Sequence, residues 1–467
     1  MSLTWAGAAG VATLLICLAG GASALAARPL ETGFFDSGRY LSANPSVRAD
    51  ALDLTLASAS SIARVNVIWR DVAPSEPATP EDPDDPAYQW ERLDAFVNDA
   101  LARGIRPLLS VRSAPTWAEG PERPAWAPEG TWQPSPAALR SFATALAKRF
   151  PEVDDFQAWN EANLSVYLTP QWRGRQLVAA RHYRRMLRSF YEGVKAAGAE
   201  NRVVSVGLGP YGDQVGSVSL RVARTRPLAF WREVFCLRGR VKLRPARKCA
   251  DKAKFDVFAY HAINTSGGPR RSALHPDDAS TPDLQNAVRI LRAAERHGQI
   301  GGSRKRHPVW MTEMWWESKP PDPIGVPLRK HARWLTEALY ILWKQGARVA
   351  INLQVRDAAF DGQPGRHNLQ AGLAFAENFR EGARKPAFRA WRFPFLPQKR
   401  SKRRVLGWGR APVGGVLVIE RQRGKGWRRV RRARVRAGQV FRVRLRVAGR
   451  PKLRARIGQE VSLAWKP

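Results

Sequence analysis

The chain has 467 residues, of which 44% are hydrophobic, and its formal net charge is +37. This hydrophobic content is that of a globular protein with a sizeable core and argues against a mainly disordered chain. The length allows two or three domains, or one large barrel with a small appendage. The excess of Lys and Arg indicates either affinity for polyanions or Arg-rich codon usage, and both interpretations stay open.

Residues 1–27 have the pattern of a secretory signal. The apolar run Val11–Ala19 is too short to span a bilayer, and Ala24–Ala26 fits an A-x-A cleavage site. No Lys or Arg precedes the apolar run, so an uncleaved membrane anchor is the alternative. No later segment has a span's length of uninterrupted apolar residues. We therefore expect a secreted or cell-surface protein without a transmembrane span after signal cleavage.

Short apolar runs alternate with amphipathic segments from about residue 32 to residue 354. Runs of this kind are typical of strands covered on both faces, as in parallel sheets. Eight strands are expected, at 32–35, 62–69, 105–111, 155–161, 202–208, 255–261, 308–313 and 347–354. The clearest helices between them are expected at 90–104, 135–150, 284–298 and 328–346.

Eight strand–helix units predict a (β/α)8 TIM barrel over residues 28–398. An open, doubly wound sheet is the structural alternative. No G-x-G-x-x-G follows the first strand, which argues against that fold and against a dinucleotide site. We expect no cofactor.

Cys236 and Cys249 are the two cysteines that lie outside the signal, and they flank one basic loop. Two thiols that close a surface loop in an oxidising compartment are expected to form a disulfide. No His or further Cys lies beside them in the sequence, so we expect no metal site there.

Residues 399–467 have a different pattern, in which apolar residues alternate with Arg between Gly-containing turns. This period-two pattern predicts a small antiparallel β-domain, resembling a sandwich, with one strongly cationic face. The region has about two dozen Lys and Arg against two acids, Glu420 and Glu460. An anionic polymer or a cell surface is the expected partner, and the export signal makes nucleic acid an unlikely one.

Polar residues follow several of the expected barrel strands. Asn160 and Glu161 end the fourth strand, His261 ends the sixth and Glu313 ends the seventh, while Arg64 lies on the second. The carboxyl ends of barrel strands face the active site. Two carboxylates facing one bowl are what glycosidic bond cleavage requires, one as proton donor and one as nucleophile or water-activating base.

The sequence W-N-E-A-N at Trp159–Asn163 resembles the W-N-E-P-N acid/base motif of the clan-A retaining glycoside hydrolases, the xylosidase- and cellulase-like barrels. The segments Arg64–Pro74, Ser113–Ala118 and Pro308–Trp316 are similar to the second-strand, third-loop and nucleophile segments of these enzymes. The resemblance covers residues 30–395. It implies that Glu161 is the acid/base and Glu313 the nucleophile.

The same resemblance implies supporting roles for three further residues. Asn160 would bind a sugar hydroxyl, Arg64 would support the nucleophile, and His261 matches the sixth-strand histidine. The chain departs from the family at Ala162, which replaces Pro, and at Ile263 and Gln354, where a Tyr and a Trp are common. These departures concern the substrate and the rate more than the class of reaction.

Several tryptophans lie in the expected active-site loops and are candidates for stacking against sugar rings, chiefly Trp117, Trp315 and Trp316. Each could instead pack its own loop. The main hypothesis is a secreted retaining glycosidase that acts on an oligo- or polysaccharide. The alternatives are a catalytically silent sugar-binding barrel and a polyanion-binding surface protein that uses its Arg-rich C-terminal region.

Overall fold

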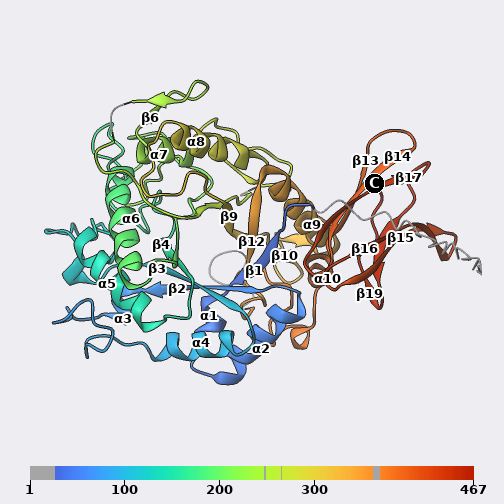
Figure 1. Ribbon diagram of the computed structural model, residues 1–467, viewed down its shortest axis with the longest axis horizontal. Helices are drawn as coiled ribbons and strands as arrows, with labels where there is room; N and C mark the ends of the chain where they lie inside the picture. The colour runs from blue at the N-terminus through green and yellow to red at the C-terminus, as the bar shows by residue number, and fades with distance from the viewer. Residues whose placement is uncertain (1–26, 247–248, 265, 361–368) are drawn as a thin grey trace, which may run out of the picture.

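The computed structural model describes residues 27–246, 249–264, 266–360 and 369–467 (Figure 1). The expected signal, apart from Ala27, lies outside the described residues. Among the described helices, none is both long and apolar enough to cross a membrane.

Eight parallel strands form one sheet, as expected for the barrel. Their order is β5-β4-β3-β2-β1-β12-β9-β8, and the first and last strands approach through a parallel bridge between Val204 and Val257. The sheet is therefore a nearly closed barrel. The strands are β1 (Glu31–Phe35), β2 (Ile62–Ile68), β3 (Arg106–Arg112), β4 (Asp155–Ala158), β5 (Arg202–Val204), β8 (Phe258–His261), β9 (Val309–Met314) and β12 (Ala347–Leu353).

Helices follow the barrel strands and surround them (Figure 1). Local chemistry sets several of their ends: the Ser135 hydroxyl accepts a hydrogen bond from the Ala138 amide at the start of α5, and Gly346 ends α9 in the left-handed conformation. The helices are α1 (Ser37–Tyr40), α2 (Pro45–Ala57), α3 (Trp69–Val72), α4 (Glu91–Leu101), α5 (Pro136–Arg149), α6 (Val178–Ala197), α7 (Pro227–Val234), α8 (Leu284–Arg296), α9 (Leu328–Gln345) and α10 (Pro386–Arg392).

The barrel interior holds an apolar layer beneath the polar site. This layer is fully or largely buried and includes Ile62, Leu108, Val204, Ala259 and Ile351. A larger apolar cluster fills the space between the strands and the helices. The polar residues above the inner layer thus stand on a packed floor and face the end of the barrel where the strands finish.

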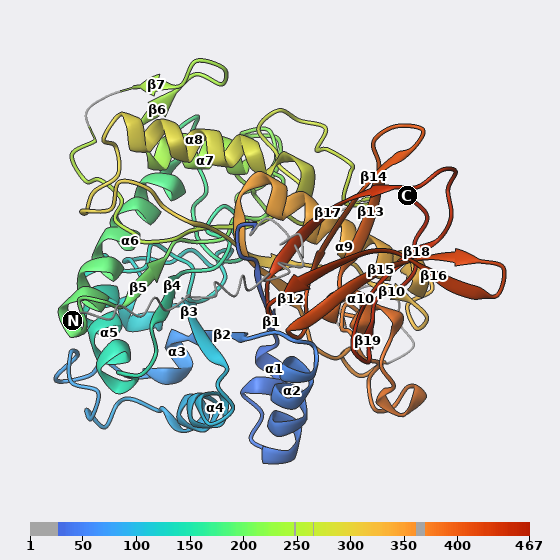
Figure 2. The ribbon, with the colours of Figure 1, turned by 45° about the vertical axis from the view of Figure 1, so that its right-hand side comes forward.

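The C-terminal region forms two antiparallel sheets beside α9 and α10 (Figures 1 and 2). Their first strand begins at Phe395, a few residues before the expected boundary at 399. Trp408 packs against Tyr340 and Trp343 of α9, with ring centroids 5.4 and 5.9 Å apart. The strands are β13 (Phe395–Lys399), β14 (Arg404–Arg410), β15 (Gly415–Arg423), β16 (Gly426–Val435), β17 (Val440–Arg446), β18 (Leu453–Ile457) and β19 (Glu460–Val461).

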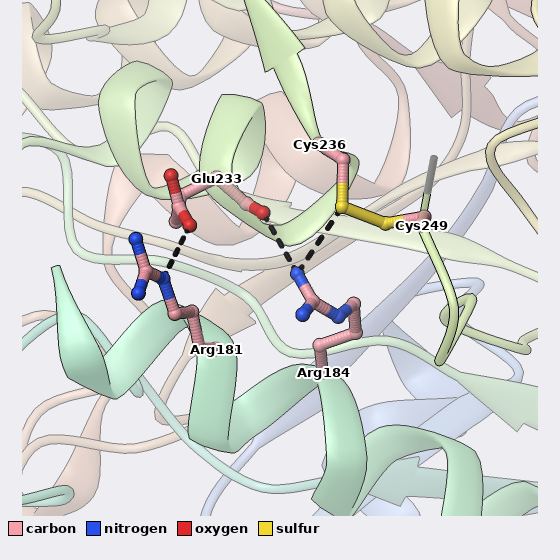
Figure 3. The surroundings of a disulfide bond; sticks show 5 residues. All are labelled: Arg181, Arg184, Glu233, Cys236 and Cys249. Atoms are coloured by element: carbon pink, nitrogen blue, oxygen red, sulfur yellow. Dashed lines mark hydrogen bonds and ion pairs between the residues drawn. A yellow bond between two sulfur atoms is a disulfide. The ribbon is translucent and has the colours of Figure 1, made fainter. Parts of the chain in front are cut away.

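Cys236 and Cys249 form a disulfide bond at the end of α7, with their Cα atoms 5.8 Å apart (Figure 3). Arg184 of α6 donates a hydrogen bond to the Cys236 sulfur and another to the Glu233 carbonyl. Arg181, one turn earlier on α6, bonds the Glu233 carboxylate at 2.7 Å. The disulfide thus joins the basic loop to a region already held by two arginines. Short paired strands, β6 (Leu237–Arg238) and β7 (Arg244–Pro245), lie in this loop, and β10 (Ser318–Lys319) pairs with β11 (Val326–Pro327) elsewhere.

Candidate active site

Glu161 and Glu313 both lie at the barrel mouth, although their strands are far apart in the strand order of the sheet. Glu313 lies near the end of β9, and Glu161 lies three residues beyond β4. The Glu161 amide donates to the Gly207 carbonyl in the segment after β5. Both side chains are largely buried, with 12% of each exposed. The structure therefore brings the two sequence-predicted carboxylates into one place.

The backbone turns abruptly where the strands meet the mouth. Ser113, Trp159 and Gln354 each have a positive φ directly after β3, β4 and β12, and Glu161 has a φ of 38°. Side chains other than glycine rarely adopt this conformation, and it costs about 1–3 kcal/mol where it occurs. At Glu161 the hydrogen bond from its backbone N–H to the Gly207 carbonyl holds the turn. The carboxylate therefore projects from a strained backbone.

His261, at the end of β8, lies between the two carboxylates. Its Nδ1 atom is 3.0 Å from Glu161 Oε1 and 3.9 Å from Glu313 Oε2. One oxygen of each carboxylate and one ring nitrogen all lie within 4.8 Å of one another. This distance matches the spacing of about 5–5.5 Å found in retaining glycosidases and is shorter than the roughly 6.5–9.5 Å of inverting ones.

Arg64 of β2 binds the nucleophile candidate and is completely buried. Its Nη1 atom donates to Glu313 Oε2 at 3.3 Å and to the Thr312 carbonyl at 3.2 Å. Its Nη2 atom donates to Asn160 Oδ1 at 2.7 Å and to the Ser110 hydroxyl at 3.2 Å. Its Nε atom donates to Gln157 Oε1 at 2.9 Å. All five N–H groups of the guanidinium therefore have an acceptor.

These contacts position Asn160 as well as Glu313. Arg64 donates a hydrogen bond to the side-chain oxygen of Asn160. The side-chain amide nitrogen of Asn160 therefore points away from Arg64 and toward other partners. Gln157 is fixed on its other side, because its Nε2 atom donates to the Ser205 carbonyl and the Thr312 hydroxyl. The guanidinium carbon of Arg64 lies over the ring of Phe35, 4.3 Å from the ring centroid. Neither Gln157 nor Ser110 stands out in the sequence, since each is one polar residue in an apolar run.

Burial dominates the electrostatics of the site. It raises the pKa of Glu161 to about 7, although the Arg64 charge opposes the shift. It also raises the pKa of Glu313 above the ordinary value, with a contribution from Glu161, whereas His261 and Arg64 oppose the rise. Arg64 contacts Glu313 directly and Glu161 only through space, so Glu313 ionises first. Glu161 therefore keeps its proton until the pH approaches about 7, while Glu313 is the carboxyl with a direct cationic partner.

His261 is neutral in this setting because burial lowers its pKa to about 3. Its Nδ1 atom donates to an ionised Glu161 in one tautomer and accepts from a protonated Glu161 in the other. The neutral ring can therefore form a hydrogen bond with Glu161 whether that carboxyl is protonated or ionised. Its Nε2 atom is buried and forms no hydrogen bond to any described residue.

Gly207 makes room for His261. A Cβ atom at this position would lie 2.1 Å from both Cδ2 and Nε2 of the imidazole, far inside contact distance. The same residue accepts the Glu161 amide. Sequence analysis did not single out Gly207, and no local pattern around it signals this role.

Gly207→Ala should displace the His261 ring and break its contact with Glu161. Overpacking of this kind costs about 1–3 kcal/mol. We therefore expect the variant to lose that amount of unfolding free energy and most of its activity. Gly426→Ala, in the C-terminal sheets, is the matched control, since a Cβ atom there makes only an ordinary contact, 3.8 Å from the Arg423 carbonyl oxygen. Thermal melts and assays of both variants test this; full activity in Gly207→Ala would contradict the packing role.

The predicted tryptophans lie in different surroundings. Trp117 donates its indole N–H to the Ala73 carbonyl and packs edge-on against Trp69, and Trp316 is 5% exposed and donates to the Gly267 carbonyl. Both rings therefore pack loops. Trp315 is half-buried, and its indole N–H has no hydrogen-bond partner among the described residues. Stacking of a sugar on any of the three stays a prediction.

Arg112 and Tyr167 are two residues near the site that sequence analysis missed. Arg112 ends β3 two residues after Ser110, and because side chains alternate along a strand it leaves the sheet on the same inner face as Ser110. It donates to the Ser113 hydroxyl at 2.9 Å, lies 5.8 Å from the Tyr167 ring and forms no ion pair with a described residue. Burial raises the pKa of Tyr167 well above its ordinary value, with contributions from Glu161 and Glu313.

A cavity of about 760 Å³ lies at this rim, lined by Arg112, Asn66 and residues of α1 and the segment after β2. Asn66 follows Arg64 by two residues, and its Oδ1 atom is buried and forms no hydrogen bond to a described residue. The Arg112 guanidinium therefore borders a space large enough for a sugar, and Asp71 and Glu91 line the same space.

Glu161, His261 and Glu313 would also be close enough to share a cation. The Arg64 guanidinium already bonds Glu313 and adds a positive charge beside it, which disfavours a second cation at that point. The arrangement is better suited to a reacting carbon that develops positive charge between the two carboxyls than to a resident cation.

The chain matches no protein-family model and no curated protein sequence. Among solved structures it is similar to a family 39 glycoside hydrolase from the gut symbiont Bacteroides cellulosilyticus WH2, with 15% identity, a TM-score of 0.56 and coverage of 90% of this chain and 81% of that one. It is also similar to the virulence factor SghA, solved with its substrate analogue salicin, with 13% identity, a TM-score of 0.50 and coverage of 76% of this chain and 93% of that one.

Identities this low establish the fold alone. The chain has a (β/α)8 barrel fold similar to that of this family 39 glycoside hydrolase, as the strand–helix pattern predicted, followed by C-terminal antiparallel sheets.

The raised pKa of Glu161 predicts a pH-dependent effect on stability. Because the folded-state pKa of about 7 lies above the ordinary 4.5, the protonated carboxyl stabilises the fold fully below about pH 4.5, and this contribution is lost as the pH rises through 7. Glutamine cannot ionise. Glu161→Gln should therefore gain stability relative to the wild type between pH 4.5 and pH 8, by up to about 3 kcal/mol.

Chemical denaturation of both proteins at pH 4.5 and pH 8 measures this difference. Glu152→Gln, at an exposed position, should show no such change and is the control. A constant difference between wild type and Glu161→Gln across this range would show that Glu161 has an ordinary pKa.

Proposed function

We propose that the protein is a retaining glycoside hydrolase that cleaves O-glycosidic bonds by double displacement. The observation that carries the proposal is the pair of carboxylates at the barrel mouth, with oxygens within 4.8 Å of each other and only one of them bonded to Arg64. That spacing leaves room for a sugar carbon between the two side chains but not for an interposed water.

In the first step, ionised Glu313 attacks the anomeric carbon while protonated Glu161 donates its proton to the leaving glycosidic oxygen. The C–O bond to the leaving group breaks, and a covalent glycosyl ester with Glu313 forms. In the second step, Glu161 takes a proton from a water molecule, whose oxygen attacks the anomeric carbon and releases Glu313. Two inversions retain the configuration of the sugar.

The surrounding residues fit these roles. Arg64 favours the ionised form of Glu313, and Asn160, whose oxygen it holds, keeps an amide N–H for a sugar hydroxyl. His261 shifts between donor and acceptor as Glu161 loses and regains its proton. Both carboxylates and their partners are present, which argues against a silent sugar-binding barrel.

The substrate is expected to be an oligo- or polysaccharide, and the protein is expected to meet it outside the cell, as the signal pattern of residues 1–27 suggests. Fractionation of the source cells, with mass spectrometry of the mature N-terminus, tests export. A full-length N-terminus in the cytoplasm would contradict it.

Removing either carboxyl should lower turnover by at least about 100-fold, measured with a panel of aryl glycosides. The two variants should differ in azide. Glu161→Ala keeps the nucleophile, so azide should intercept the glycosyl ester and give a glycosyl azide of retained configuration. Glu313→Ala lacks it, so azide should attack directly and give the inverted product. Glu152→Gln is the control. Unchanged activity in both variants would reject the assignment.

The pH dependence of kcat/KM should be bell-shaped. The reaction needs protonated Glu161, so activity should fall as the pH rises through about 7. It also needs ionised Glu313, which sets the acidic side. For a substrate with a good leaving group, the fall on the alkaline side should disappear in Glu161→Gln. If kcat/KM of that variant still fell on the alkaline side, a group other than Glu161 would be responsible for the fall.

The sugar is expected to carry an acidic group, because Arg112 lines the rim cavity and forms no ion pair with a residue that the structure describes. Arg112→Gln should lower kcat/KM for an aryl uronide by about tenfold or more, with little effect on the matching neutral glycoside, and Arg112→Lys should recover part of the loss. Equal losses on both substrates would instead indicate a structural role for Arg112.

A further inference from the structure

The C-terminal sheets contain a groove of about 770 Å³ that is lined by arginine and aliphatic side chains, here called the arginine groove. It is lined by β14 and β17, which pair in one sheet, and by β16 of the other sheet. Six of its ten lining residues are arginines, and none of the ten is acidic or aromatic. The lining residues are Arg400, Arg404, Val405, Leu406, Val430, Arg431, Arg442, Arg444, Leu445 and Arg446.

About half of the described arginines of the barrel differ from these six because they have acidic partners. Arg48 pairs with Asp99, Arg149 with Asp94 and Arg356 with Asp50, at 2.6–2.8 Å. The groove arginines form no ion pair with any residue that the structure describes. Arg-rich codon usage alone would not separate paired from unpaired arginines in this way.

The two acids of the C-terminal region are already used elsewhere. Glu420 bonds Arg454 and Arg456, at 2.7 and 3.2 Å, and Glu460 bonds Arg392 of α10. The positive charge of the groove is therefore not neutralised from within this region. A partner of opposite charge is what the groove lacks.

The sheet register places these arginines close together despite their repulsion. Arg404 of β14 lies directly opposite Arg446 of β17, and like charges in this position destabilise a sheet. Arg442, Arg444 and Arg446 alternate along β17, so they leave one face of the strand at intervals of about 7 Å. A row of cations at regular spacing suits a linear polymer with repeated negative charges.

We propose that the arginine groove binds an acidic polysaccharide. Guanidinium groups bind carboxylates or sulfates through paired hydrogen bonds, and the aliphatic side chains of Leu406 and Val430 offer apolar contact to the C–H faces of sugar rings. A groove for single-stranded nucleic acid combines positive charge with aromatic rings on which bases stack, and this groove has no ring. The binding does not depend on hydrolysis at the barrel mouth.

The test uses the full chain and polygalacturonate as the probe, with neutral dextran as the reference polymer. Wild-type protein should bind polygalacturonate at low salt and not dextran, and the affinity should fall as salt rises. The variant Arg404→Gln/Arg444→Gln/Arg446→Gln should bind at least about tenfold more weakly, because three of the groove's charge-assisted contacts are lost.

The matched control removes the same charge from another face. The control residues lie between the end of α8 and the start of β9. They are exposed and form no ion pair with described residues: Arg296, Lys305 and Arg306. Their triple Gln variant should bind polygalacturonate within about threefold of the wild type. If one triple variant fails to fold, judged by its melting curve, the single variants Arg444→Gln and Arg306→Gln replace the pair.

Equal losses in the groove and control variants would overturn the proposal, because they would show a response to net charge alone. Tighter binding of DNA, or of vesicles containing an anionic lipid, at the same charge concentration would also overturn it if the groove variant abolished that binding. A loss confined to the groove variant and to the acidic polysaccharide would establish the site.

Discussion

The active-site arrangement depends on one buried cation, Arg64. An unpaired guanidinium in the barrel interior would be very costly, so all five of its N–H groups must be satisfied. The acceptors come from β3, from β4 and Asn160 directly after it, and from β9, so one side chain of β2 connects three other strands of the barrel. The positions of Asn160 and Glu313 follow from this constraint.

The same cation divides the two carboxyls into different chemical roles. Glu313 touches the guanidinium, whereas Glu161 touches the neutral ring of His261 instead. Burial alone would raise both pKa values, and the direct contact is what separates them. In the proposed mechanism, this difference allows a proton donor and a nucleophile to lie a few ångströms apart, which two equivalent carboxyls could not do.

The barrel and the C-terminal sheets manage positive charge in opposite ways. In the barrel, ion pairs take up much of the arginine charge between helices and loops, as Arg356 and Asp50 illustrate. In the sheets, the period-two pattern places arginines outward with two acids available for the whole region. A fold built for stability alone would disperse or pair these charges, so their concentration in a groove suggests a ligand.

The sequence alone determined the eight barrel strands, the C-terminal strands and the polar residues at the strand ends, because each depends on local periodicity and on the strand–helix alternation. Only the tertiary structure decided which polar groups meet. Arg64 and Glu313 are 249 residues apart, and the space that Gly207 leaves for His261 depends on a neighbouring strand. Likewise, the loop positions of Trp117 and Trp316 left sugar stacking and loop packing both open. Only the structure shows that their indole N–H groups donate to the Ala73 and Gly267 carbonyls, because contacts between distant segments leave no trace in local pattern.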